Sequence, residues 1–98
     1  MSHEDDPVVK FIVKKSYDFF NEPKIYLFGS RAKKSNSERS DYDFAIDTNG
    51  AQFGVWARFL SEVEEGAPTL LKLDLIKLDS QISEELLGEI AKTRIALH

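Results

Sequence analysis

The residues Tyr26–Ile46, YLFGSRAKKSNSERSDYDFAI, contain most of two expected strands and the segment that joins them. Lys24–Phe28, which leads into it, is short, β-branched and aromatic, as buried strands are, and Gly29 ends it. Asp41–Asp47 alternates with period two, which predicts a second strand with one apolar face and one largely acidic face. The apolar face, expected toward the core, carries Tyr42, Phe44 and Ile46, and the other face carries Asp41, Asp43, Ala45 and Asp47.

Helical and strand patterns alternate along the rest of the chain, which predicts an α/β (α+β) domain. A third strand is expected within Leu70–Leu78, and the residues IAL at 95–97 predict an edge strand. The expected helices run from Pro7 to Asn21, from Phe53 to about Gly66 and from Ser83 to about Thr93, with a short helix beginning at Ser30.

Composition limits the classes of function. With 98 residues and 42% hydrophobic content, the chain is expected to form a single domain, residues 1–98. A formal net charge of −4 disfavours stable nucleic-acid binding, which needs a basic surface. The absence of cysteine excludes thiolate metal sites and fits a reducing compartment. The acidic start, MSHEDDPVV, and the short apolar runs predict neither a signal peptide nor a membrane span, so we expect a cytoplasmic protein.

Asp41 and Asp43 are candidate metal ligands. Side chains two apart on a strand project from one face about 6 to 7 Å apart, near enough for both carboxylates to reach one ion. Without a cation, such neighbours repel each other and one takes up a proton. Oxygen ligands alone favour a hard ion, Mg²⁺ or Mn²⁺. Asp74, on the third strand, extends the predicted cluster to a site for two ions that clamp the attacking and leaving oxygens of a phosphoryl or nucleotidyl transfer.

The Gly29-Ser30 turn is a candidate phosphate site. A glycine directly after a strand lets the backbone approach a ligand closely, and amides at a helix start point N–H groups at an anion. Ser30 adds a hydroxyl donor, and Arg31 adds positive charge. Lys33 and Lys34 either contribute to the same site or form a solvated loop, and the sequence leaves this open.

Each of these signals alone has an ordinary structural explanation. Gly-Ser is common turn chemistry, Asp-x-Asp often marks a solvated strand edge, and Asp74 by itself is equally well explained as a charge that protects an edge strand. The combination is more informative. With Gly, Ser and Asp each at about 5 to 7% of residues, Gly-Ser and Asp-x-Asp at one fixed spacing arise by chance on the order of once in a thousand such chains.

The motif Gly29-Ser30, ten residues, Asp41-Tyr42-Asp43, with the later Asp74 in KLDLIKL, resembles that of the minimal nucleotidyltransferases, the smallest members of the DNA polymerase β superfamily. The resemblance covers nearly the whole chain. It implies a mixed sheet of three to four strands flanked by about four helices. In one respect the sequence departs from the family, since Lys34 stands where a second glycine is common.

The resemblance also implies an activity, the transfer of AMP from ATP. The counterparts of Asp41, Asp43 and Asp74 hold two Mg²⁺ ions, and Gly29 and Ser30 hold the β- and γ-phosphates, with Arg31 assisting. Many members act as antitoxins that transfer AMP to a tyrosine of a helical HEPN-domain toxin. The implied partners are therefore a nucleoside triphosphate and a HEPN-domain protein, with no membrane and no stable nucleic-acid binding.

Other functions stay open from the sequence. The chain could neutralise its partner by stoichiometric contact without catalysis, or transfer the nucleotide to a small molecule such as an aminoglycoside, or to RNA, which the acidic balance disfavours. The base, the acceptor and the oligomeric state, a homodimer included, are not specified by any residue of the motif.

Overall fold

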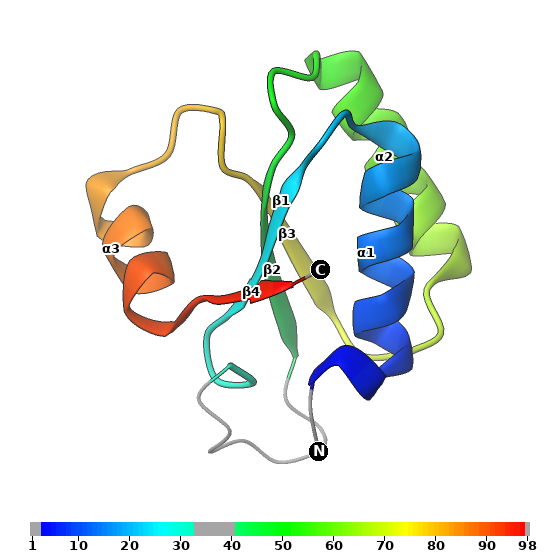
Figure 1. The fold of residues 1–98 in the computed structure, drawn as a ribbon, viewed down its shortest axis with the longest axis horizontal. Helices are drawn as coiled ribbons and strands as arrows, with labels where there is room; N and C mark the ends of the chain where they lie inside the picture. The colour runs from blue at the N-terminus through cyan, green and yellow to red at the C-terminus, as the bar shows by residue number, and fades with distance from the viewer. Residues whose placement is uncertain (1–2, 33–40, 98) are drawn as a thin grey trace.

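A computed structural model describes residues 3–32 and 41–97, and within these ranges it contains three α-helices, one 3₁₀ helix and one four-stranded sheet (Figure 1). None of these helices is long and apolar enough to cross a membrane. The helices are η1 (His3–Asp5), α1 (Pro7–Phe19), α2 (Phe53–Gly66) and α3 (Glu84–Thr93). The strands are β1 (Lys24–Phe28), β2 (Tyr42–Asp47), β3 (Leu73–Lys77) and β4 (Ile95–Leu97).

The sheet is mixed and has the order β3-β2-β1-β4. β1 is antiparallel to both β2 and β4, whereas β2 and β3 are parallel and joined through α2. The N-terminal ends of β2 and β3 therefore lie at the same edge of the sheet as the C-terminal end of β1 (the lower edge in Figure 1). This edge brings together Phe28, Asp43 and Asp74, because Phe28 pairs with Asp43 and Asp43 with Asp74.

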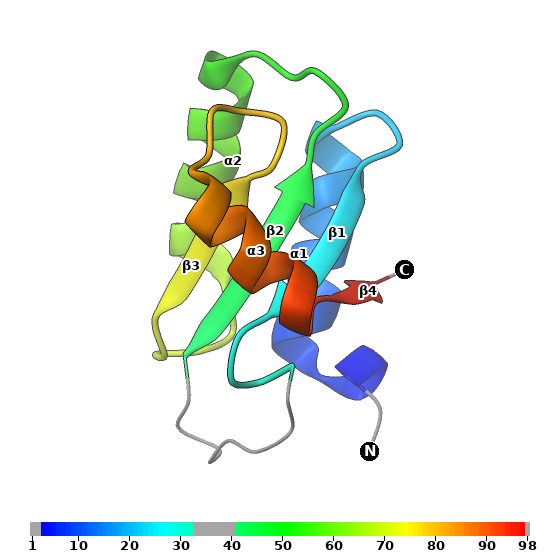
Figure 2. The same ribbon diagram turned by 90° about the vertical axis from the view of Figure 1, so that its left-hand side faces the viewer.

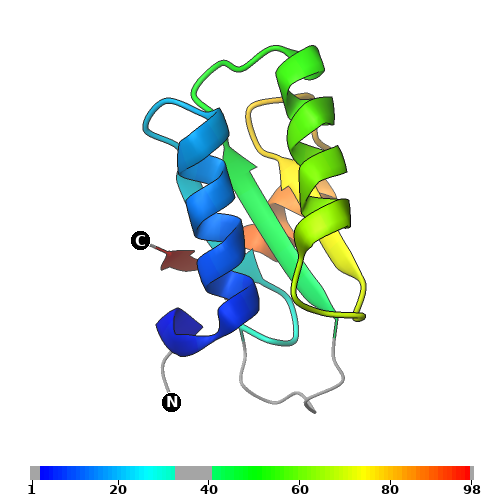
Figure 3. The ribbon, with the colours of Figure 1, turned by 90° about the vertical axis from the view of Figure 1, so that its right-hand side faces the viewer.

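Helices cover both faces of the sheet. α1 and α2 lie side by side on one face, and α3 lies on the other (Figures 2 and 3). The main core fills the α1–α2 side, where the rings of Phe20, Trp56 and Phe59 pack with centroids 4.9 to 6.0 Å apart. Each such side chain contributes about 1.5 to 3 kcal/mol through burial, so this side provides most of the stability.

A smaller core lies under α3 and contains Phe28, Ala45 and Ile90. Ala45 is fully buried, although the period-two pattern places it on the acidic face of β2. The expectation that only the alternate residues of β2 face the interior is therefore wrong. α3 covers the middle of that face, at Ala45, and leaves Asp43 before it and Asp47 after it partly open.

The expected fold class is confirmed, and so are the bounds of β1, with adjustments elsewhere. α1 ends at Phe19 rather than Asn21, because Phe20 already has an extended backbone (φ −124°, ψ 151°), and the chain then turns through a positive φ of 49° at Glu22 before Pro23. Ser30–Ala32 forms a turn instead of beginning a helix, so the described ranges contain three α-helices plus η1 rather than four helices. The predicted contribution of Lys33 and Lys34 lies outside the described residues.

Candidate active site

Asp43 and Asp74 face each other across the parallel strands β2 and β3. Asp43 is half-buried, and its pKa is raised to about 6, first by burial, then by the charge of Asp74 and a hydrogen bond to it, and further by the charge of Asp41. Lys72 opposes this shift, and its Nζ lies 3.6 Å from Asp74 Oδ1. The described residues therefore supply too little positive charge to offset both carboxylates when Asp43 and Asp74 are ionised.

Asp41 lies just before β2 and is exposed, and its negative charge acts on Asp43. Within residues 3–32 and 41–97, no three His, Cys, Asp or Glu side chains are grouped so that they could hold a metal ion. The donor set nevertheless suits a hard cation, because Asp43 and Asp74 offer neighbouring carboxylate oxygens whose mutual repulsion a divalent ion would remove. The two acids fit Mg²⁺, and Asp41 is the third acid at the same edge.

Gly29 packs directly against Asp43. Its φ of +78° lies in the left-handed region, which glycine adopts at little cost. A Cβ at this position would lie 2.5 Å from Asp43 Oδ2, so the backbone approaches the carboxylate more closely than any side chain allows. The Gly29 N–H donates to Thr93 Oγ1 at 2.9 Å, which ties the turn to the end of α3.

The rest of the turn continues from Gly29 toward the other face of the sheet. Ser30 is exposed, whereas Ala32 is buried in the main core. The guanidinium of Arg31 lies over the ring of Tyr42, with Cζ 3.9 Å from the ring centroid. Since Tyr42 and Asp43 are neighbours on a strand, their side chains project from opposite faces. Arg31 therefore lies on the α1–α2 side, opposite Asp43.

Sequence reasoning did not find Thr93 or the surroundings of Tyr42. The bond between Gly29 and Thr93 joins residues 64 positions apart, and no local pattern predicts it. Tyr42 was expected only as a core residue, yet its hydroxyl also donates to Asp6 Oδ2 at 2.6 Å. An aromatic residue with a polar tip on a core face was the available signal, since a buried Tyr hydroxyl usually has a partner.

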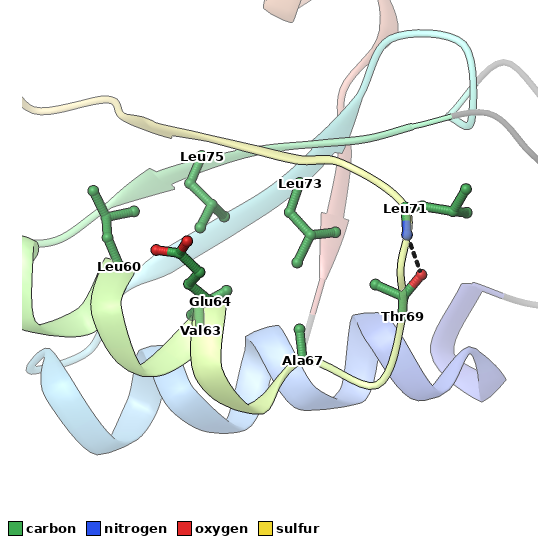
Figure 4. A pocket seen from close by; sticks show the side chains of 8 residues that line it. All are labelled: Leu60, Val63, Glu64, Ala67, Thr69, Leu71, Leu73 and Leu75. Carbon is green, nitrogen blue, oxygen red and sulfur yellow. Dashed lines mark hydrogen bonds between the residues drawn. The ribbon is translucent and has the colours of Figure 1, made fainter.

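An apolar groove of about 450 Å³ lies between α2 and β3, on the side of the sheet away from the acids (Figure 4). Leu73 and Leu75 point from β3 toward Leu60 and Val63 of α2, and Asp74 between them projects to the opposite face. The groove is therefore separate from the candidate active site.

A mixed four-stranded sheet with helices on both faces presents paired acids and a tight glycine turn at one edge, an α/β arrangement suited to phosphate chemistry. The chain belongs to the polymerase beta nucleotidyltransferase family, whose sequence model matches residues 12–98. No sequence among the curated proteins matches the chain.

Several solved structures have a similar fold. A crystal structure of a toxin–antitoxin with AMP-PNP is 21% identical, has a TM-score of 0.63, and matches over 90% of this chain and 70% of that chain. An MntA-HpeT toxin–antitoxin mutant with a Tyr-to-Ala substitution is 22% identical with a TM-score of 0.63, over 91% and 70%. A second MntA-HpeT mutant, with two Asp-to-Glu substitutions, is 19% identical with a TM-score of 0.61, over 90% and 70%. At these identities the likeness concerns the fold.

Proposed function

We propose that this chain is a Mg²⁺-dependent nucleotidyltransferase that transfers AMP from ATP to a hydroxyl of a protein partner. The observation that carries the proposal is the packing of the Gly29 turn against Asp43, which in turn faces Asp74. Phosphate-binding backbone and metal-binding carboxylates are thereby held at one edge of the sheet. Nucleotidyl transfer needs both groups at one place.

In this reaction an acceptor hydroxyl oxygen forms a bond to the α-phosphorus, the bond from that phosphorus to the β-phosphate oxygen breaks, and pyrophosphate leaves. The hydroxyl proton passes to a carboxylate of the site or to water. Bound Mg²⁺ supplies the positive charge that offsets the charge of the phosphates. Asp43 and Asp74, with Asp41, would hold the metal, as two ions according to the family resemblance.

The turn would hold the triphosphate. Gly29 has no side chain between its backbone and the carboxylate pair, so a phosphate can approach closely. Ser30 is exposed and offers a hydroxyl donor beside it. Arg31 follows in the same turn and adds a positive charge at this end of the sheet.

We further propose that the partner is a helical toxin of the HEPN class and that this chain is its antitoxin. The support is the likeness of fold to the MntA-HpeT toxin–antitoxin structures and to the toxin–antitoxin with AMP-PNP. One of those mutants carries its two Asp-to-Glu changes two positions apart, which is the spacing of Asp41 and Asp43 here.

Transfer of label tests the proposal. Purified protein is incubated with α-labelled ATP, Mg²⁺ and the candidate toxin, and the toxin is expected to carry the label. The double substitution Asp41→Asn with Asp43→Asn should abolish labelling, since it removes both charges of the motif. Asp47→Asn is the matched control, because Asp47 belongs to the same strand at its far end. Undiminished labelling by the double variant would sink the mechanism.

One observation favours a second function, that of an antitoxin acting by contact alone. In the described part of the chain, three acids are not grouped as a ready metal site. In this case the double Asp variant should neutralise the toxin at equimolar dose as well as wild type does. If neutralisation is lost while the two proteins still bind each other, contact alone is not the mechanism.

A further inference from the structure

Arg31 stacks on an aromatic ring that the core holds fixed. Its guanidinium carbon lies 3.9 Å from the centroid of Tyr42, within the range of a strong cation–π contact. Tyr42 is 5% exposed, and its ring lies parallel to that of Phe44, with centroids 5.9 Å apart and an interplanar angle of 2°. Arg31 therefore rests on a rigid surface, and the turn that carries it is attached to the core at this point.

The hydroxyl end of Tyr42 is hydrogen-bonded to the residue that caps α1. The Tyr42 hydroxyl donates to Asp6 Oδ2 at 2.6 Å, and Asp6 Oδ1 accepts from the Val8 N–H at 2.8 Å as the N-cap of the helix. Burial, together with this hydrogen bond and the charge of Asp6, raises the pKa of Tyr42 to about 12, so the hydroxyl stays a donor. Turn, ring and helix cap form one connected series.

This series lies on the face of the sheet opposite Asp43 and Asp74. Arg31, Tyr42 and Asp6 line one cavity of about 500 Å³ on the α1 side, whereas Asp43 and Asp74 project to the side of α3. A phosphate held beside Asp43 would therefore be separated from the Arg31 guanidinium by the end of the sheet. The stacked position of Arg31 fits a supporting role better than a direct phosphate contact.

We propose that Arg31 is a positioning residue that fixes the Gly29-Ser30 turn by stacking on Tyr42, and that its guanidinium does not contact the phosphates. The inference rests on the proposed function, because it concerns the same nucleotide site. It assigns a positioning role to Tyr42 as well. The charge of Arg31 then matters less for binding than the aromatic surface beneath it.

A double-mutant cycle on ATP binding separates the two roles of Arg31. Affinities are measured by calorimetry with Mg²⁺-ATP for wild type, Arg31→Ala, Tyr42→Leu and the double variant. Loss of a cation–π contact at a partly desolvated site predicts that each single change weakens binding roughly 3- to 30-fold. If Arg31 and Tyr42 both act through the stack, the double variant should bind ATP as tightly as the single variant that has the lower ATP affinity.

Two control variants keep the result interpretable. Tyr42→Phe retains the ring and the core packing, so ATP affinity should stay within about threefold of wild type. Arg58→Ala removes the same charge from an exposed position on α2 and should leave affinity unchanged. Urea unfolding of every variant identifies any change that acts only by destabilising the fold.

Multiplicative losses in the double variant, or a Tyr42→Leu variant that binds ATP normally while Arg31→Ala does not, would overturn the inference in favour of direct phosphate contact. Failure of the proposed function looks different, because wild type would then not bind ATP. The stack is in that case tested by hydrogen exchange. The Gly29 and Ser30 amides should exchange faster in both Arg31→Ala and Tyr42→Leu, and unchanged exchange in both would reject the positioning role.

Discussion

The two ends of the β2–β3 pair place the same residue type in opposite electrostatic surroundings. At the candidate active-site end Asp43 faces another acid and its pKa is raised to about 6. At the other end burial also opposes the ionisation of Asp79, but bonds from Thr48, Gly50 and Lys77 outweigh it and hold the pKa of Asp79 well below its usual range. One end is complete within the protein. At the other end, Lys72 offsets the charges of Asp43 and Asp74 only in part.

The contacts of Asp79 explain why its pKa is low. It accepts from the Thr48 N–H at 2.9 Å and its hydroxyl at 2.8 Å, from the Gly50 N–H at 2.9 Å, and from Lys77 Nζ at 3.1 Å. Lys77 and Thr48 are both buried. Asp79 thus neutralises a buried ammonium and fixes the loop after β2, which makes this end the structural counterpart of the active-site edge.

Asp79→Ala is expected to have the largest effect on stability. The substitution leaves Lys77, whose side chain is 6% exposed, without its counter-charge, and a broken buried pair of this kind costs about 3 to 4 kcal/mol of unfolding free energy. Urea denaturation at neutral pH measures the loss. Asp18→Ala, which breaks an exposed pair within α1, should cost less than about 0.5 kcal/mol.

Lys77→Met sharpens this result. With the buried charge replaced by an apolar side chain, Asp79→Ala should cost distinctly less than in the wild-type background, because no unpaired ammonium remains. Equal losses in the two backgrounds would mean that Asp79 acts through the loop amides and not through Lys77.

Glycines at the two ends provide the second test. Gly29 and Gly50 have φ values of +78° and +89°, so alanine at either is expected to cost about 1 to 2 kcal/mol of stability. A Cβ at Gly50 meets no atom within 4 Å, whereas one at Gly29 meets the Asp43 carboxylate. Because that carboxylate can rotate away, Gly29→Ala should weaken Mg²⁺-ATP binding by more than about tenfold, with Gly50→Ala as the matched control for strain. Equal Mg²⁺-ATP affinities of the Gly29→Ala and Gly50→Ala variants would show that Gly29 is not part of the nucleotide site.

Much of this arrangement could be predicted from sequence because its signals are local. Pro23 and Gly29 bracket β1, and the alternation after Asp41 identifies β2, so the neighbouring placement of Asp43 and the acid of β3 follows from topology. The roles of these acids stay a prediction. The cover that α3 gives to Ala45 could not be predicted, because it depends on how a distant helix packs.

Tertiary contacts also decide the parts of the site that sequence reasoning missed. The pattern after Gly29 does not determine on which face Arg31 lies, since a turn residue follows whatever surface the fold offers, here the ring of Tyr42. The network around Asp79 joins residues about 30 positions apart and carries no motif. Spacing therefore predicts which residues are chemically active, and packing determines which residues surround them.

Removal of the charge at the active-site end should stabilise the protein. Because the pKa of Asp43 is about 6 in the fold and about 3.9 in the unfolded chain, ionisation costs stability as pH rises from about 4 to 6. The shift corresponds to at most about 3 kcal/mol, and solvent screening reduces this to about 1 to 2 kcal/mol. Asp43→Asn should therefore be more stable than wild type at pH 8 and equal to it below pH 4, as measured by urea unfolding without metal.

The groups around Asp43 allow this prediction to be checked. Burial, Asp74 and Asp41 raise its pKa and Lys72 lowers it, so Asp74→Asn should reduce the pH effect to the part that burial and Asp41 cause, and Lys72→Ala should enlarge it. Addition of Mg²⁺ at pH 8 should raise the stability of wild type and narrow its gap to Asp43→Asn. A wild type that is more stable than Asp43→Asn at pH 8 without metal would contradict the comparison between the two ends.

Thr93→Val is expected to have the smallest effect. The substitution keeps the side-chain volume but removes the acceptor for the Gly29 N–H, a part-buried bond worth about 0.5 to 1.5 kcal/mol. Hydrogen exchange at the Gly29 amide should accelerate by a corresponding factor of about 2 to 12, while the Asp79 end stays protected. Thr69→Val removes an equivalent bond, the one that Thr69 Oγ1 accepts from the Leu71 N–H at 3.0 Å, and should leave Gly29 exchange unchanged. If Thr93→Val does not alter exchange at Gly29, α3 does not hold the turn, and the active-site edge depends on its contacts with the α1 side.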